Sequence, residues 1–206
     1  MNSSSQYTVD VVDDLLFLGP ALEKIGQAHN LTVERSEPNW IPFVSDFESA
    51  ADTVVIRAEL ADHVPTVLKV RGIRNIGATP IVVCDDPTDA HTQRLYQAGA
   101  RAVLTKSHSL HDLVQAIKGW GGGVRNRNEV SDVMLSDREL QAACLYAGSA
   151  APSARVLSEI LNLPLTSVRT YIHRARVALR QVAPTSSRRD LRQALIFDGW
   201  LDDAPR

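Results

Sequence analysis

The chain has 206 residues, 44% hydrophobic and 22% charged, a composition typical of a globular protein with one or two domains. It contains no run of eighteen apolar residues and begins with a polar segment, so we expect a cytoplasmic protein with no contact with membrane. Lysine and arginine number 10 against 15 acids up to residue 124, but 12 against 9 acids after it. The second half is therefore the part suited to a polyanion.

Five short runs rich in β-branched residues predict strands at 8–12, 31–34, 53–56, 81–84 and 102–104. Most of the segments between them show helical spacing. Strands that are apolar on consecutive positions and alternate with helices predict an α/β domain, a doubly wound five-stranded parallel sheet. Residues 31–52 are the exception, because Pro38 and Pro42 interrupt the pattern where a second helix is expected.

Three consecutive glycines, Gly121 to Gly123, end this pattern, and the spacing beyond them is helical at 137–146, 154–161, 165–179 and 188–201. We therefore assign residues 1–120 to the α/β domain, 121–133 to a linker, 134–183 to an all-α domain and 184–206 to an additional C-terminal helix. Ser136 and Glu139 have the spacing of a capping box. The last helix is expected to dock on its own domain, on the first domain or on a second subunit.

The segment 153–180 has the pattern of two helices joined by a tight turn at Asn162–Leu163, with Pro164 at the start of the second helix. Along that second helix, apolar residues recur every three or four positions and predict a buried face. The opposite face carries hydroxyl, imidazole and guanidinium groups and no acid. Such groups donate to base edges and phosphates, and we predict that DNA is bound by Thr166, Ser167, Arg169, Thr170, His173 and Arg176.

The pattern of these residues is similar to that of a known protein family. The segments 135–140 and 167–172, with Leu161 between them, resemble the LuxR/NarL-type helix-turn-helix over about residues 134–179. The resemblance implies that Thr166, Arg169 and Thr170 face the bases, while His173 and Arg176 lie nearer phosphate. The sequence departs from the family at 151–155 and at residue 158, and the segment 163–176 also resembles sigma factor region 4. Both relatives read DNA with this helix.

The first half resembles a response-regulator receiver domain over about residues 8–120. Residues 11–14 resemble the end of the first strand with its acid pair, and residues 99–106 resemble the segment of the fifth strand with its lysine. In that family two acids hold Mg²⁺, and an aspartate that closes the third strand accepts a phosphoryl group. Asp13, Asp14 and Lys106 occupy family positions, but Arg57 stands at the acceptor position and Asp85 stands where the family has serine or threonine. Val103 likewise replaces an aromatic residue.

A guanidinium cannot accept a phosphoryl group, so the resemblance implies a degenerate receiver pocket. Glu59, two residues further on, is a weak substitute for the missing acceptor. Two interpretations of Arg57 remain open: it pairs with Asp13 or Asp14 and takes the place of the metal, or it points to solvent while the two acids cap the first helix.

The sequence thus predicts a transcription regulator that binds double-stranded DNA as a homodimer, independently of aspartate phosphorylation, under the control of a ligand, a protein partner or its own abundance. The alternative is a sigma-region-4-like or adaptor protein that acts through RNA polymerase or another regulator. An enzyme is not expected, because the sequence has no glycine-rich phosphate loop, no metal-ligand set and no nucleophile with its base. No cofactor is expected either.

Overall fold

The computed structural model describes residues 6–47, 50–62, 64–119, 131–148 and 150–201. It divides into two compact units: Met1–Pro87 with Leu95–Asn126, which we call the receiver-like unit, and Thr88–Arg94 with Arg127–Arg206, which we call the helical unit. The glycine triplet and most of the predicted linker fall outside the described residues. Among the helices that are described, none is both long and apolar enough to cross a membrane.

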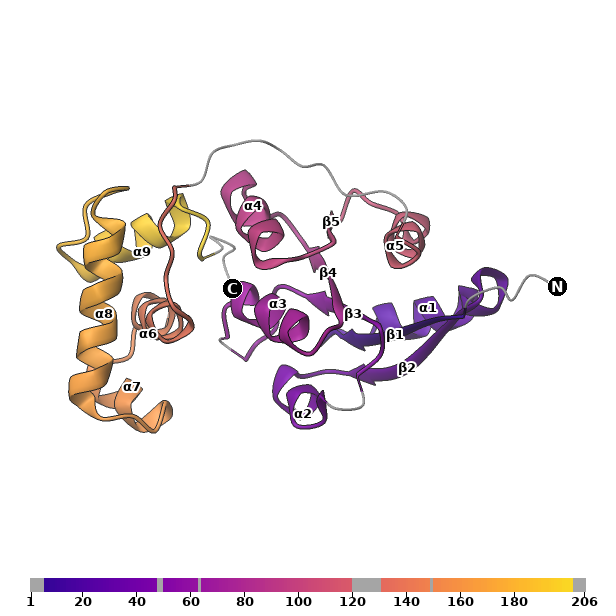
Figure 1. Cartoon of the computed structure of the whole chain (residues 1–206), viewed down its shortest axis with the longest axis horizontal. Helices are drawn as coiled ribbons and strands as arrows, with labels where there is room; N and C mark the ends of the chain where they lie inside the picture. The colour runs from indigo at the N-terminus through magenta and orange to yellow at the C-terminus, as the bar shows by residue number, and fades with distance from the viewer. Residues whose placement is uncertain (1–5, 48–49, 63, 120–130, 149, 202–206) are drawn as a thin grey trace. The chain divides into compact units, whose positions relative to one another are not determined.

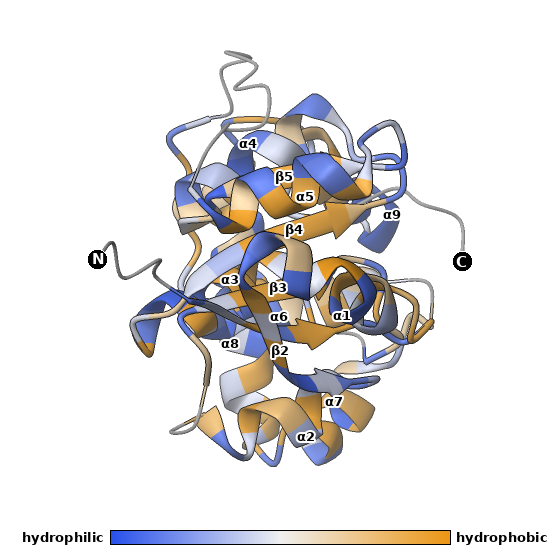
Figure 2. Cartoon of the chain, turned by 90° about the vertical axis from the view of Figure 1, so that its right-hand side faces the viewer, coloured by the Kyte–Doolittle hydropathy of each residue, from blue (hydrophilic) through white to orange (hydrophobic). Residues whose placement is uncertain are grey.

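The receiver-like unit contains a sheet in which all five strands run parallel, in the order β2-β1-β3-β4-β5. The strands are β1 (Tyr7–Val12), β2 (Leu31–Glu37), β3 (Thr53–Arg57), β4 (Thr79–Cys84) and β5 (Ala102–Thr105). The predicted doubly wound parallel sheet is confirmed. Figure 2 shows β4 in the hydrophobic colour, whereas β2, at one edge of the sheet, includes hydrophilic residues.

The helices of this part of the chain are α1 (Leu18–His29), α2 (Trp40–Val44), α3 (Thr66–Asn75), α4 (Asp89–Ala98) and α5 (Leu110–Ile117). Helix α4 is divided between the two units after Arg94. Helices α1 and α5 cover one face, and α2 and α3 lie on the other (Figure 1). The core under α1 and α5 is formed by fully buried side chains that include Val11, Leu22, Val55 and Val114. With apolar residues on both faces of its inner strands, the sheet holds its loops at the carboxyl edge in fixed positions.

The segment in which the sequence shows no clear periodicity folds around aromatic side chains. Trp40 and Phe43 of α2 are buried, and their rings lie 5.7 Å apart. Beside them, buried Asp10 of β1 receives two hydrogen bonds from Arg35 of β2, from Nη2 at 2.8 Å and from Nε at 3.2 Å. Both features depend on partners far away in the sequence, so local periodicity does not reveal them.

The helical unit contains α6 (Asp137–Ala147), α7 (Ala154–Ile160), α8 (Leu165–Leu179) and α9 (Arg188–Phe197). The predicted capping box of Ser136 and Glu139 is present at the start of α6. Pro164 is the residue that precedes α8, one position before the predicted place. Asn162, in the turn between α7 and α8, adopts a left-handed conformation with φ of 49°, which asparagine tolerates better than most residues.

Helix α9 packs within its own unit, against α6 and α8, through Leu191 and Leu195, which are both fully buried. After it, Asp198 accepts hydrogen bonds from Ser131 and from the indole of Trp200, at 3.0 and 2.8 Å. Asp198 also pairs with Arg94, which belongs to the same unit, at 2.6 Å. Both charges of this ion pair are buried, so removal of either one would strongly destabilise the helical unit.

Candidate functional site

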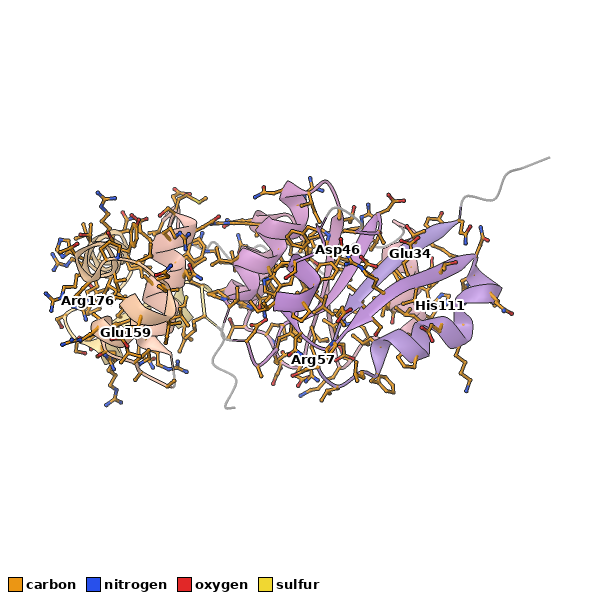
Figure 3. The ribbon with its side chains drawn as sticks, turned by 90° about the horizontal axis from the view of Figure 1, so that it is seen from below. Glu34, Asp46, Arg57, His111, Glu159 and Arg176 are labelled. Carbon is orange, nitrogen blue, oxygen red and sulfur yellow. The ribbon has the colours of Figure 1, made fainter. Side chains whose placement is uncertain are left out.

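The carboxyl edge of the parallel sheet holds the first candidate site, which we call the Arg57 pocket. Arg57 is the last residue of β3, and its guanidinium reaches three acids: Asp85 at 3.0 Å, Glu59 at 3.4 Å and Asp14 at 3.7 Å. Figure 3 labels Arg57 within the receiver-like unit. Burial lowers the pKa of Arg57, but the nearby charges of Asp85, Glu59 and Asp14 outweigh this and raise it above its ordinary value. The pocket therefore contains a permanent cation.

Asp13 serves a different purpose from its neighbour Asp14. Its carboxylate is almost fully buried and accepts hydrogen bonds from the backbone amides of Leu15, Phe17 and Leu18, at 3.1, 2.9 and 2.9 Å. Both interpretations of the sequence thus hold in part, because one acid caps the start of α1 and the other pairs with Arg57. The three amides leave Asp13 with little capacity to coordinate a metal ion.

The two remaining predicted pocket residues, Asp85 and Lys106, do not share one ion-pair network. Asp85 belongs to the Arg57 pocket, but Lys106 pairs at 3.9 Å with Asp86, and both of these side chains are mostly exposed. Glu59 is held from two directions, because it contacts Arg57 and accepts the amide of Asp85 at 2.8 Å. A carboxylate engaged in this way is a poor nucleophile. In the described part of the chain, no group of three or more acids, histidines and cysteines has the arrangement of a metal site.

The second candidate site is the outward face of α8. Its apolar residues Val168, Ile172, Ala175 and Leu179 are buried, as the spacing predicted. The predicted DNA-binding residues lie on the other side of the helix, where the structure shows Thr166, Arg169, Thr170 and His173 exposed and Ser167 and Arg176 half-buried.

No acid occurs between Leu165 and Leu179, so α8 as a whole carries a positive field. Thr170 donates its hydroxyl to the carbonyl of Thr166 at 2.8 Å, which leaves the oxygen of Thr170 free to accept only. Arginine side chains present several donors at once, and the exposed Arg169 is therefore the strongest candidate for contact with a base edge on this face.

Tyr146 of α6 and Arg188 lie next to this helix, and the sequence pattern singled out neither of them. Arg188, the first residue of α9, stacks on the ring of Tyr146 with 4.1 Å between guanidinium and ring centroid. Arg176 of α8 lies 5.6 Å from the same ring. The sequence marks Arg188 only as one of several basic residues in its segment, because nothing in the local pattern indicates a contact with α6.

Neither a protein-family model nor a curated protein matches the sequence. Solved structures of RcsB do match. RcsB of Salmonella typhimurium, described as a response regulator, is 14% identical with a TM-score of 0.60, and the match covers 96% of this chain and 100% of that one. The chain has the fold of RcsB.

Two further RcsB structures match over 93% of this chain and 98% of theirs. One is RcsB from Salmonella enterica serovar Typhimurium bound to promoter rprA in the presence of phosphomimetic BeF3⁻, 14% identical with a TM-score of 0.59. The other holds two RcsB dimers bound to two parallel DNAs, 15% identical with a TM-score of 0.54. The likeness to RcsB thus establishes the combination of a receiver-like fold and a helical fold, and the chemistry must be argued from the residues of this chain.

Proposed function

We propose that the protein is a DNA-binding transcription regulator that uses α8 as its recognition helix. The observation that carries the proposal is the division of α8 into a fully buried apolar face and an exposed face of arginine, histidine and threonine without an acid. A helix of this kind, preceded by a short helix and a tight turn, fits the major groove. In this assignment Thr166, Arg169 and Thr170 face the bases, and His173 and Arg176 contact the backbone.

The proposal extends to a receiver-like unit that does not take up phosphate. Arg57 ends the strand at which an acceptor carboxylate is required, and its charge already neutralises Asp14, Glu59 and Asp85. A phosphoryl group at this edge would need Mg²⁺ held by free carboxylates, whereas Asp13 is occupied by backbone amides. Control of the protein then lies with a ligand, a protein partner or its abundance.

DNA binding by a dimer completes the proposal. Two copies of α8 related by a twofold axis match two half-sites about one helical turn apart, and homodimers are the commonest assemblies with such symmetry. The RcsB structure on two parallel DNAs contains dimers, which supports the same arrangement for this chain. The expected DNA site is therefore an inverted repeat.

The experiment is a selection of genomic fragments by the full-length protein, followed by affinity measurements on the recovered sites with and without a small phosphodonor and Mg²⁺. We expect a palindromic site whose affinity does not change with the phosphodonor. The variant Arg57→Lys keeps the charge and removes the guanidinium fork. It is measured alongside the wild type, with and without the phosphodonor. Recovery of no DNA would refute the regulator assignment, and a phosphodonor-dependent gain in affinity would refute the statement about phosphate.

A second candidate function is an adaptor that acts through RNA polymerase or another regulator. It is favoured by one observation: the loop between β1 and α1 exposes Leu15, Leu16 and Phe17, three consecutive large apolar side chains, by 66%, 50% and 69%. Exposed apolar clusters of this kind often bind other proteins. An adaptor would recover no DNA in the selection by itself and would recover promoter fragments once polymerase is added, which separates the two functions.

A further inference from the structure

Two histidines from different helices lie side by side on the receiver-like unit, and we call them the histidine pair. His29 is in the last turn of α1 and is half-buried, whereas His111 is in the first turn of α5 and is exposed. Their ring centroids are 6.4 Å apart, and the ring planes make an angle of 64°. The two residues are far apart in the sequence, so no local spacing indicates that they meet.

Two other histidines have contacts that account for their positions. Nδ1 of His91 lies 2.9 Å from the carbonyl oxygen of Gly199, and Nδ1 of His108 accepts the amide of Thr105 at 3.0 Å. Each of these rings therefore satisfies a backbone group. The histidine pair differs from them, because its two rings contact each other edge to face.

The spacing of the histidine pair suits a shared metal ion. Imidazole nitrogen is a common ligand of Zn²⁺, with bonds of about 2.0 to 2.1 Å, so two imidazoles on one tetrahedral ion hold their centroids roughly 5 to 6 Å apart. The observed 6.4 Å is slightly longer. Rotation about the side-chain bonds of the exposed His111 can remove a difference of about 1 Å.

The surroundings of His111 orient its ring and limit the number of ligands. Gln115 lies one helical turn further along α5, and its amide nitrogen is 3.2 Å from Nε2 of His111. Outer contacts of this kind hold metal-binding histidines in place. Asp112 is engaged elsewhere, because its carboxylate accepts the amide and the hydroxyl of Ser109, both at 2.7 Å. The histidine pair thus supplies two ligands.

Two imidazoles fill only half of a zinc site, since structural sites almost always have four protein ligands. No group of three or more potential ligands occurs in the described part of this chain. A second copy related by a twofold axis would present the same two histidines, because both partners in such a dimer use the same patch. Four imidazoles would then surround the ion.

We propose that the histidine pair is half of a site for a divalent transition-metal ion, and that a second copy of this chain completes it. The ion joins α1 and α5 of one protomer to the same helices of its partner. Imidazole suits zinc, copper and nickel, whereas magnesium and calcium prefer oxygen ligands. The inference rests on the dimer of the proposed function and deepens it, because it makes assembly depend on the supply of metal.

The test is a titration of metal-free, full-length protein with Zn²⁺, followed by light scattering to measure the mass in solution. We expect one ion to bind for every two chains, with a doubling of the mass that a chelator reverses. Mg²⁺ should have no effect. Binding of one ion to each chain without a change in mass would overturn the role of the second copy, and so would a dimer whose formation ignores zinc.

Variants assign the ligands. His29→Gln and His111→Gln should each lower the affinity for Zn²⁺ at least about a hundredfold, since even the loss of an outer contact costs about 10- to 100-fold. Gln115→Leu should lower it about tenfold without changing the stoichiometry. His108→Gln is the matched control, because it removes a neighbouring imidazole that the site does not use. Zinc binding equal to that of the wild type in both histidine-pair variants would overturn the site.

DNA binding distinguishes failure of this inference from failure of the proposed function. The selected inverted repeat is titrated with protein in the presence of a chelator or of Zn²⁺. Zinc should raise the affinity of the wild type and leave that of His29→Gln unchanged. An affinity of the wild type that zinc does not alter would overturn metal-dependent assembly while DNA binding stands. Recovery of no DNA under either condition would refute the proposed function itself.

Discussion

Replacing Arg57 by methionine removes the cation of the Arg57 pocket and keeps the apolar part of its side chain. Three carboxylates then lie close together without a counter-charge. The pair with Asp85 is largely screened, because the Asp85 side chain is 61% exposed, whereas the side chains of Glu59 and Asp14 are 18% and 30% exposed. Pairs at protein surfaces contribute about 0 to 1 kcal/mol each, so we expect Arg57→Met to destabilise the receiver-like unit by about 1 to 2 kcal/mol.

Hydrogen exchange of the amides in β1 and β3 is the suitable assay, since it reports on this unit separately from the helical unit. Protection should fall roughly 5- to 30-fold at neutral pH. The raised pKa of Arg57 means that its contribution is fully present below its ordinary value and is lost only in strong alkali. Because salt screens charges near a protein surface, the difference between wild type and variant should shrink as the salt concentration rises.

Arg57→Lys retains the charge and should recover most of the protection. Equal or greater protection in Arg57→Met at neutral pH would show that the cost of burying the guanidinium exceeds its attraction to the acids. A difference that does not change as salt is added would show that charge is not the cause.

Four further predictions concern other parts of the chain. Arg169→Ala should cost about 1 to 3 kcal/mol of specific DNA binding and relax sequence choice, as competition with mutated sites would reveal. Asp198→Ala should destabilise the helical unit by about 3 to 5 kcal/mol in urea titrations, because it removes the carboxylate that neutralises the buried charge of Arg94. Gly26→Ala should destabilise the receiver-like unit by about 1 to 3 kcal/mol in thermal melts, since its Cβ would lie 2.5 Å from a backbone oxygen of β2. Cys144, whose pKa burial raises to about 12, should not react with a thiol reagent at pH 8 until the protein unfolds.

The sheet and α8 were predictable because their signals are local. Consecutive apolar residues such as Val54 and Val55 indicate a strand buried on both faces, and the spacing of Val168 and Ile172 fixes the buried side of α8. Once that side is known, the outward residues follow from helical geometry. The predicted strand at 31–34 was too short, because the alternating polar residues up to Glu37 belong to an edge strand that needs only one apolar face.

The candidate sites were predictable only up to the choice of partner. From the sequence, Asp13 and Asp14 were equally good partners for Arg57. The structure distinguishes them, because the backbone amides at the start of α1 donate hydrogen bonds to Asp13 and Asp14 pairs with Arg57. The stack of Arg188 on Tyr146 joins residues from helices at opposite ends of the unit's sequence. A contact of that kind has no periodicity, so neither propensity nor spacing indicates it.

The burial of Leu191, Leu195 and Trp200 has a consequence at the level of the gene. A premature stop codon anywhere in the region that encodes α9 would remove the side chains that pack on α6. Helix α8 would keep its sequence but lose its packing contacts with α9. Such a product would expose apolar surface and be removed by cellular proteases. Nonsense mutations between the codons for Arg180 and Trp200 should therefore behave as null alleles, even though every residue proposed to contact DNA precedes them.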